Sequence, residues 1–251
     1  MKLSVCLDAV YGGKDFFASL EEVRAIGYDA IEFWSWWDKD VDRLARIVRE
    51  QKLTIASMCV KNANLVDASS RDAFLDGLKA SIAAAKQLDC RSLIATVGQE
   101  LADVPREAQH QSIVDGLSAG APLLEEAGIT LVLEPLNTLV DHKGYYLSSS
   151  EEAFDIVRKV GSPNVKLVFD IYHQQITEGN LLANIIPNLE LIGHFHAAGN
   201  PGRHELSSGE LHYGRIFQAI EAAGYEGYMG LEYFPVAAPE VGLKELLVAY
   251  A

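Results

Sequence analysis

The regular alternation of short apolar runs with longer amphipathic segments constrains the fold of this chain more than any other feature. Eight runs rich in β-branched and aromatic residues predict strands at Leu3–Leu7, Ala30–Trp34, Thr54–Val60, Ser92–Val97, Thr130–Leu136, Val165–Ile171, Leu191–Ala197 and Tyr228–Phe234. The segments between them have helical periodicity at Phe16–Ile26, Asp42–Gln51, Arg71–Leu88, Arg106–Ala127, Ser150–Val160, Tyr213–Ala223 and Val241–Tyr250, with only a short helix expected in Gly179–Asn188. This pattern predicts an α/β protein whose parallel sheet is covered by helices.

Eight strand and helix units in 251 residues predict a single (β/α)8 TIM barrel, one domain spanning residues 1–251. Hydrophobic residues make up 49% of the chain, which is enough for a packed interior. The alternative is a doubly wound open sheet, which normally carries a G-x-G-x-x-G turn after its first strand. Gly12-Gly13 does not supply that turn, so the barrel is favoured.

The net charge and the cysteine content limit which partners and which cellular compartment we expect for this protein. The formal net charge of -14 repels phosphate backbones and anionic membranes, so we expect neither nucleic acid nor membrane as a partner. Cys6, Cys59 and Cys90 form no C-x-x-C pair, which argues against disulfides and thiolate metal sites and favours a reducing cytoplasm. We also expect no secretory leader and no membrane span, since no segment has the required apolar stretch.

Four consecutive predicted strands end in an ionisable residue: Glu134, Asp170, His196 and Glu232. The carboxyl ends of barrel strands surround one shared site, so these side chains should converge. Each carboxylate follows apolar residues, and burying it without a partner is costly. A cap or an ion pair explains one such residue more easily than four on neighbouring strands. Three carboxylates and an imidazole suit one divalent metal, Mn²⁺ or Mg²⁺ first and Co²⁺ or Zn²⁺ as alternatives.

Two of these residues, Glu134 and Glu232, are also candidates for proton transfer. A metal bound to a carbonyl and an adjacent hydroxyl acidifies the C–H between them, and a flanking glutamate can take the proton. Strands five and eight would lie on opposite sides of a metal centred among strands five to eight. The pattern therefore predicts epimerisation by two bases or isomerisation by one, on a small hydroxy-carbonyl substrate such as a sugar.

Residues in the predicted loops are candidates for substrate contact. His173, in the loop after strand six, would polarise a substrate oxygen, with a surface histidine as the alternative. Trp34 follows the second strand and would line a sugar-binding pocket or pack under a loop. The turn-forming loop 200–205 offers Arg203 and Glu205 to substrate, a solvated arginine being the alternative. His194 lies one layer deeper than the predicted metal ligand on its strand, and we interpret it as a hydrogen-bonded core residue.

Several ordered segments resemble the xylose isomerase-like barrel superfamily, most closely its hydroxypyruvate isomerase family, over essentially the whole chain. They are Glu134-Pro135-Leu136-Asn137, Gly144-Tyr145-Tyr146-Leu147, Asp170-Ile171-Tyr172-His173, Ile192-Gly193-His194, Asn200-Pro201-Gly202-Arg203-His204-Glu205, Gly209-Glu210-Leu211-His212-Tyr213 and Leu231-Glu232-Tyr233. The resemblance implies a metal held by the four ligands proposed above, with Glu134 and Glu232 as acid and base. It further implies substrate contact by His173 and Arg203, and assembly as a homo-oligomer.

Departures from the relatives leave the substrate open. Hydroxypyruvate isomerases favour glutamine at position 196, whereas the similar ketose 3-epimerases place histidine there, so a three-carbon keto acid and a five- or six-carbon ketose (tagatose or psicose type) are both candidates. A dehydratase of a keto-polyol on the same scaffold and a non-enzymic sugar-sensing barrel are further alternatives. True xylose isomerases carry a lysine where this chain has Leu136. Apurinic endonucleases use extra histidines on strands three and four, and Ser57–Val60 and Ile94–Val97 contain none.

Overall fold

The computed structural model describes residues 1–250, in which eight parallel strands close into a barrel. The strands are β1 (Lys2–Cys6), β2 (Ala30–Phe33), β3 (Thr54–Cys59), β4 (Ser92–Ala95), β5 (Thr130–Leu133), β6 (Val165–Asp170), β7 (Ile192–Ala197) and β8 (Tyr228–Leu231). Each strand pairs with its neighbours in the chain, and β8 closes on β1 from Lys2 opposite Tyr228 to Val5 opposite Leu231. The predicted (β/α)8 barrel is confirmed.

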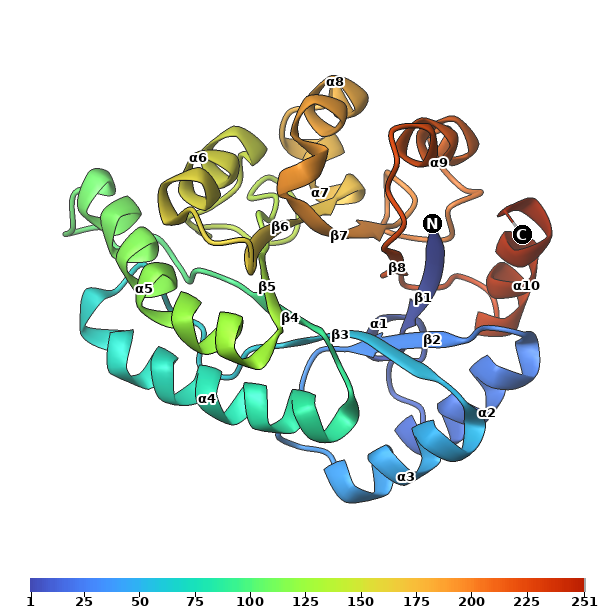
Figure 1. Ribbon diagram of the computed structural model, residues 1–251. Helices are drawn as coiled ribbons and strands as arrows, with labels where there is room; N and C mark the ends of the chain where they lie inside the picture. Colours follow the sequence, from blue (N-terminus) through green and yellow to red (C-terminus); the bar gives the residue numbers. More distant parts are fainter. Residues whose placement is uncertain (251) are drawn as a thin grey trace.

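The helices lie around the outside of the strands (Figure 1). They are α1 (Leu7–Val10), α2 (Phe16–Ile26), α3 (Val41–Gln51), α4 (Arg71–Leu88), α5 (Arg106–Ala127), α6 (Ser150–Val160), α7 (Ile171–Thr177), α8 (Leu181–Ile185), α9 (Tyr213–Ala222) and α10 (Pro239–Tyr250), with 3₁₀ turns at Ala68–Ser70 and Ile186–Leu191. The predicted bounds of α2, α4, α5 and α6 are confirmed to the residue.

Local sequence signals explain where these helices begin and end. Asp15 and Asp40 accept hydrogen bonds from the first-turn amides of α2 and α3, and Ser149 Oγ does the same for α6. Gly128 and Gly161 follow α5 and α6 with φ of 65° and 66°, a left-handed conformation that glycine adopts without strain. These caps let each helix stop a few residues before the next strand.

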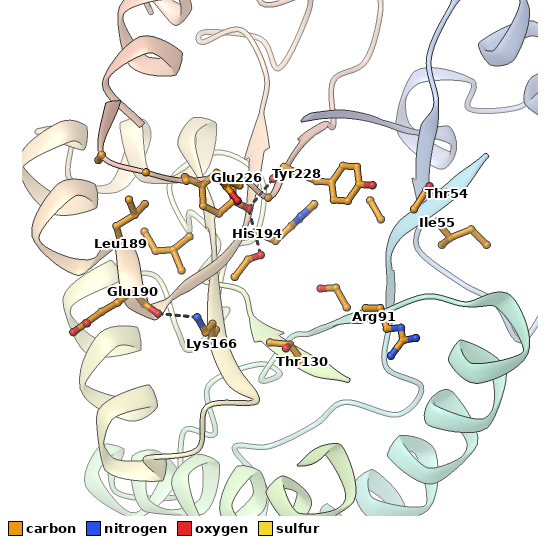
Figure 2. A pocket seen from close by; sticks show the side chains of 18 of the residues that line it. Thr54, Ile55, Arg91, Thr130, Lys166, Leu189, Glu190, His194, Glu226 and Tyr228 are labelled. Atoms are coloured by element: carbon orange, nitrogen blue, oxygen red, sulfur yellow. Dashed lines mark hydrogen bonds between the residues drawn. The ribbon is translucent and has the colours of Figure 1, made fainter. Parts of the chain in front are cut away.

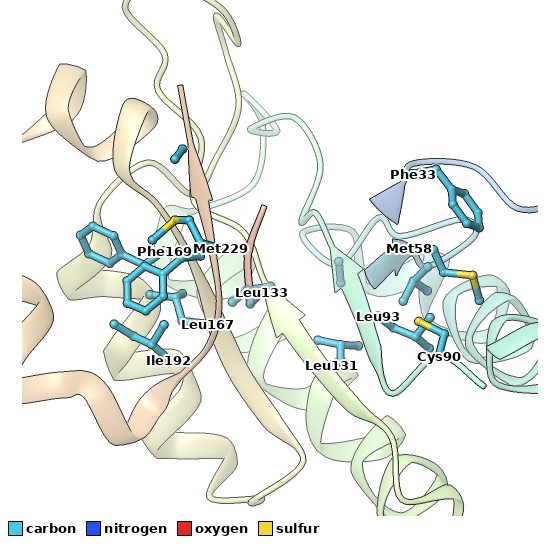
Figure 3. Packing of buried hydrophobic residues seen from close by; sticks show 14 of the residues in the cluster. Phe33, Met58, Cys90, Leu93, Leu131, Leu133, Leu167, Phe169, Ile192 and Met229 are labelled. Carbon is cyan, nitrogen blue, oxygen red and sulfur yellow. The ribbon is translucent and has the colours of Figure 1, made fainter. Parts of the chain in front are cut away.

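The main apolar core fills the layer between the barrel and its helices. Alternate strand residues such as Leu131, Leu133 and Phe169 point into this layer (Figure 3). Residues of the opposite parity face the barrel interior, where Val132 and Val168 pack with Ile94 in a separate small cluster. Apolar residues therefore fill the interior beside β4, β5 and β6, and the polar residues described below occupy the rest.

Two local predictions are corrected by the structure. The ladders of β4, β5 and β8 end at Ala95, Leu133 and Leu231, two or three residues before the predicted ends. Apolar residues that follow, such as Val97, Leu136 and Tyr233, are buried in loops instead. His173, predicted in a loop, lies in the first turn of α7. Asp170 caps that helix by accepting a hydrogen bond from the His173 amide at 2.9 Å, so the chain turns helical directly after β6.

Across residues 1–250, none of the helices combines the length and the apolar character that a membrane crossing needs.

Candidate metal centre

The four predicted ligands meet at the carboxyl ends of β5, β6, β7 and β8. Glu134, Asp170, His196 and Glu232 each offer one donor atom, and these atoms all lie within 4.8 Å of one another. His196 Nδ1 is 3.0 Å from Glu134 Oε1, 3.7 Å from Glu232 Oε2 and 3.9 Å from Asp170 Oδ2. All four residues are buried, none exposing more than 7% of its surface. The structure thus brings together every residue predicted to bind metal.

This donor set fits a divalent cation. Ligand atoms on opposite sides of an ion that each bind at about 2.0–2.2 Å lie about 4.0–4.4 Å apart, close to the spread of these four atoms. Three buried carboxylates repel one another, and burial removes the water that would otherwise solvate them. A divalent cation offsets both costs, and the oxygen majority favours hard ions such as Mn²⁺ and Mg²⁺.

The pKa shifts within the cluster show how burial and neighbouring charges act on its carboxylates and on His196. Burial raises the pKa of Glu134 and of Asp170 above their ordinary values. Burial also opposes the charged form of Glu232, but the positive charges of His196 and Arg203 outweigh it and lower the pKa of Glu232. Burial likewise opposes a charged His196, yet the surrounding carboxylates, Glu232 first, raise its pKa well above the usual range. The cluster therefore contains more carboxylate than its own cations can balance.

Two predicted substrate contacts, Trp34 and Arg203, both bind Glu232. The Trp34 indole N–H donates to Glu232 Oε1 at 2.6 Å, and Arg203 Nη2 donates to Glu232 Oε2. Trp34 is 37% exposed, whereas Arg203 is buried and stacks 5.5 Å from the centre of the Tyr172 ring. Both donors hold one carboxylate in place, and Arg203 lies within the cluster rather than in a solvated loop.

His173 is fully buried beside the four metal-ligand candidates. Its Nδ1 faces two N–H groups of Asn137, the side-chain Nδ2 at 2.6 Å and the backbone amide at 3.3 Å. Nδ1 is therefore the acceptor, and Nε2 carries the hydrogen. That Nε2 has no hydrogen-bond partner and lies 3.7 Å from Asp170 Oδ2. Burial, aided by the charge of Arg203, lowers the pKa of His173 well below its ordinary value, so the ring is a neutral donor.

Glu205, the remaining predicted contact, points elsewhere. Its Oε1 accepts hydrogen bonds from the backbone amides of Val236 and Ala237 at 3.0 and 3.3 Å. In this structure the Glu205 carboxylate holds the segment that connects β8 to α10, and it is not grouped with the four metal-ligand candidates.

Sequence reasoning missed Glu32, a buried carboxylate in β2. Glu32 Oε2 accepts hydrogen bonds from Ser4 Oγ and from His194 Nε2, both at 2.9 Å. Glu32, His194 and His196 form a second group of close donors. The prediction that His194 is a hydrogen-bonded core residue is confirmed. A signal for Glu32 was present, since it follows Ala30 and Ile31 as a lone charge in an apolar strand.

A large cavity lies at the other end of the barrel. It has a volume of about 810 Å³ and opens beside the amino ends of β3, β4, β5, β7 and β8, with Thr54, Thr130 and Tyr228 in its wall (Figure 2). In most TIM barrels this end serves stability and the carboxyl end serves catalysis. His194 also lines this basal cavity. The cavity is therefore separated from the metal-ligand candidates by the interior of the barrel.

The fold and the donor set together define an α/β barrel with a buried cluster of donors, at the carboxyl ends of its strands, that could hold a divalent metal ion. Residues 20–248 match the family model described as xylose isomerase-like TIM barrel. The chain is 31% identical to the hydroxypyruvate isomerase of Escherichia coli (strain K12), over 97% of each chain. It is 37% identical to the 2-oxo-tetronate isomerase of Cupriavidus necator, over 57% of this chain and 54% of that one.

Among solved structures, the chain resembles one described as AP endonuclease, family 2 from Brucella melitensis, with a TM-score of 0.94, 29% identity and 98% of each chain covered. Within residues 1–250, the groups of close metal-binding donors include no residue of β3 or β4.

The chain belongs to the xylose isomerase-like TIM barrel family. Its place beside the hydroxypyruvate and 2-oxo-tetronate isomerases makes it an isomerase of that family.

Proposed function

We propose that the protein isomerises a short 2-oxo acid carrying a hydroxyl group beside its carbonyl, using one divalent metal and two glutamates. The observation that carries this proposal is the presence of Glu134 and Glu232 in one buried cluster with two further donors, Asp170 and His196. The names of the two isomerase relatives both denote activity on 2-oxo acids, which supports the substrate class.

The chain's own residues would move one proton between two carbons. A bound divalent cation supplies the positive charge that acidifies the C–H next to the carbonyl and stabilises the enediolate. One glutamate of the pair takes the proton from the hydroxyl-bearing carbon, and a proton returns to the former carbonyl carbon. A second proton passes from one oxygen to the other, so the carbonyl and the hydroxyl exchange places. The sequence needs no external oxidant or reductant.

Neighbouring groups would orient the substrate. His173 presents a buried Nε2–H without a partner, suited to donate to a substrate oxygen. Arg203 is the guanidinium nearest to the candidate ligands, and it would attract the carboxylate of a 2-oxo acid. A neutral ketose lacks that carboxylate, which is why we favour the keto acid over the ketose.

Hydrogen exchange with solvent tests this proposal. The metal-loaded protein is incubated with Mn²⁺ in D₂O, with hydroxypyruvate and separately with D-tagatose and D-fructose, and the sugars and acids are analysed by mass spectrometry. We expect one deuterium on carbon and an isomerised product with hydroxypyruvate. Glu134→Gln and Glu232→Gln should each lower the rate by about 10²–10⁴-fold, the usual contribution of proton transfer by a positioned side chain. Glu100→Gln, at an exposed salt bridge with Arg106, is the matched control.

Three outcomes would contradict the proposal in different ways. If none of the compounds gains deuterium, the enediolate mechanism is excluded. Turnover of the ketoses without turnover of hydroxypyruvate would make the protein a ketose 3-epimerase. In a separate incubation with a cyclic keto-polyol such as an inosose, loss of water with the absorbance of a conjugated enone would make it a dehydratase.

A further inference from the structure

Glu32 is placed where it contacts both histidines of β7 from inside the barrel. Its Oε1 lies 3.1 Å from His196 Nε2, and its Oε2 accepts from His194 Nε2 at 2.9 Å. Only 2% of the Glu32 surface is exposed. The contact with His196 reaches the ring from the side opposite the metal ligands, because His196 Nδ1 faces Glu134.

A neutral imidazole carries one hydrogen, on either Nδ1 or Nε2, and binds metal through the other nitrogen. The positions of the donors around His196 make Nδ1 the metal-facing atom. Nε2 must then carry the hydrogen, and Glu32 Oε1 lies 3.1 Å from it. In this structure both atoms are buried without a hydrogen-bond partner, so each is free to pair with the other when Nδ1 binds metal. Metal-binding histidines commonly donate their second N–H to a carboxylate, which fixes both the tautomer and the ring orientation.

We propose that Glu32 is a positioning residue that holds the His196 ring with Nε2–H toward Glu32 and the Nδ1 lone pair toward the metal. The inference rests on the proposed metal site. Glu32 touches neither substrate nor metal in this arrangement, and it acts only through His196.

The surroundings of Glu32 are shaped to receive its carboxylate. A Cβ added to Gly230, in β8, would lie 2.1 Å from Glu32 Oε1, so any larger residue there must displace the carboxylate. Ser4 and His194 already saturate Oε2 with two donated hydrogen bonds. His194 Nε2 is thus engaged with the carboxylate, which favours positioning over a second metal site built from Glu32, His194 and His196.

The test compares Mn²⁺ affinity in wild type and in Glu32→Gln, measured by electron paramagnetic resonance with the full-length protein. The amide keeps the size of the side chain but replaces one acceptor oxygen with a donor. We expect Mn²⁺ to bind about 10–100-fold more weakly, the usual effect of removing an outer partner of a metal ligand. Ser57→Ala removes a buried hydroxyl of the same barrel, bonded to Ser92 rather than Glu32, and should change the affinity by less than about threefold, well below that effect.

A spectroscopic measurement on wild type does not depend on any variant folding. In the Zn²⁺-loaded protein labelled with ¹⁵N-histidine, the His196 signal, assigned with His196→Gln, should show hydrogen on Nε2 and none on Nδ1. Hydrogen on Nδ1, or a Glu32→Gln affinity equal to wild type, would overturn the inference. Binding of two ions per chain would also overturn it, because Glu32 would then be a ligand. Failure of wild type to bind any divalent ion would instead refute the proposed metal site.

Discussion

Gly230→Ala tests the crowding inside the barrel most directly. Gly230 lies in β8, and the added methyl group would lie 2.1 Å from Glu32 Oε1 and 2.7 Å from Glu32 Cδ, where ordinary contacts are 3.4–4 Å. The carboxylate must therefore retreat by about 1.3 Å, the difference between 3.4 and 2.1 Å. We expect a retreat of that size to carry Oε1 away from its 3.1 Å contact with His196 Nε2 and to disturb the hydrogen bonds that Ser4 and His194 donate to Oε2.

The cost has two parts. Overpacking a filled interior costs about 1–3 kcal/mol, and drawing the buried Glu32 carboxylate away from its donors Ser4 and His194 costs about 1–3 kcal/mol more. A total of about 3 kcal/mol lowers the melting temperature of a chain of this length by about 6–12 °C. The assay is thermal unfolding followed by circular dichroism in EDTA, together with Mn²⁺ titration of the folded variant.

Gly214→Ala is the matched control. Gly214 lies in α9, and its added Cβ would meet His212 Cε1 at an ordinary 3.4 Å. Alanine is a better helix former than glycine by about 1 kcal/mol, so the control should melt at the wild-type temperature or slightly higher. If Gly230→Ala melts within about 1 °C of wild type, a change worth less than about 1 kcal/mol, and binds Mn²⁺ as tightly, the reasoning about Glu32 is wrong.

Three other perturbations address the site and the thiols. Trp34→Phe removes a donor to Glu232 and should lower kcat/KM about tenfold or more, as expected for a hydrogen bond to a charged group. Trp36→Phe, whose indole donates to Ser81 instead, should leave kcat/KM unchanged. Equal effects of the two substitutions would contradict this role of Trp34. Mn²⁺ at about 100 times its Kd should raise the melting temperature by about 5–11 °C. Asp170→Asn should abolish most of that shift. A shift that persists in the variant would exclude Asp170 as a ligand. Burial raises the pKa of Cys90 to about 12 and the pKa values of Cys6 and Cys59 well above normal, so the thiols stay protonated below those values. At pH 8 a disulfide reagent should therefore titrate no thiol until the protein is unfolded, and rapid reaction of the native protein would count against this.

The barrel and the four-residue cluster could be predicted because each depends on a repeating local pattern. Every strand ends at the same face, so a charged residue at the end of an apolar run has a known position. Predicted strands ran too far where apolar residues continue into loops. Leu136 and Tyr233 are buried by tertiary packing rather than by the sheet, and apolarity alone cannot separate these causes.

Glu32 was missed for a different reason. It is the third residue of a four-residue strand, whereas the prediction considered only ionisable residues at strand ends. Its apolar neighbours Ile31 and Phe33 carried the same signal as those of Glu134, a charge that must find a buried partner. The role of Asn137 could not be predicted, because it depends on which nitrogen of His173 the fold turns toward it.

A single carboxylate links the two ends of this barrel. His194 borders the basal cavity, and Glu32 joins it to His196 at the catalytic mouth. Anyone redesigning the base of the barrel would here be altering the support of a candidate metal ligand. Mutational tolerance should therefore follow this chain of contacts and not distance from the active site.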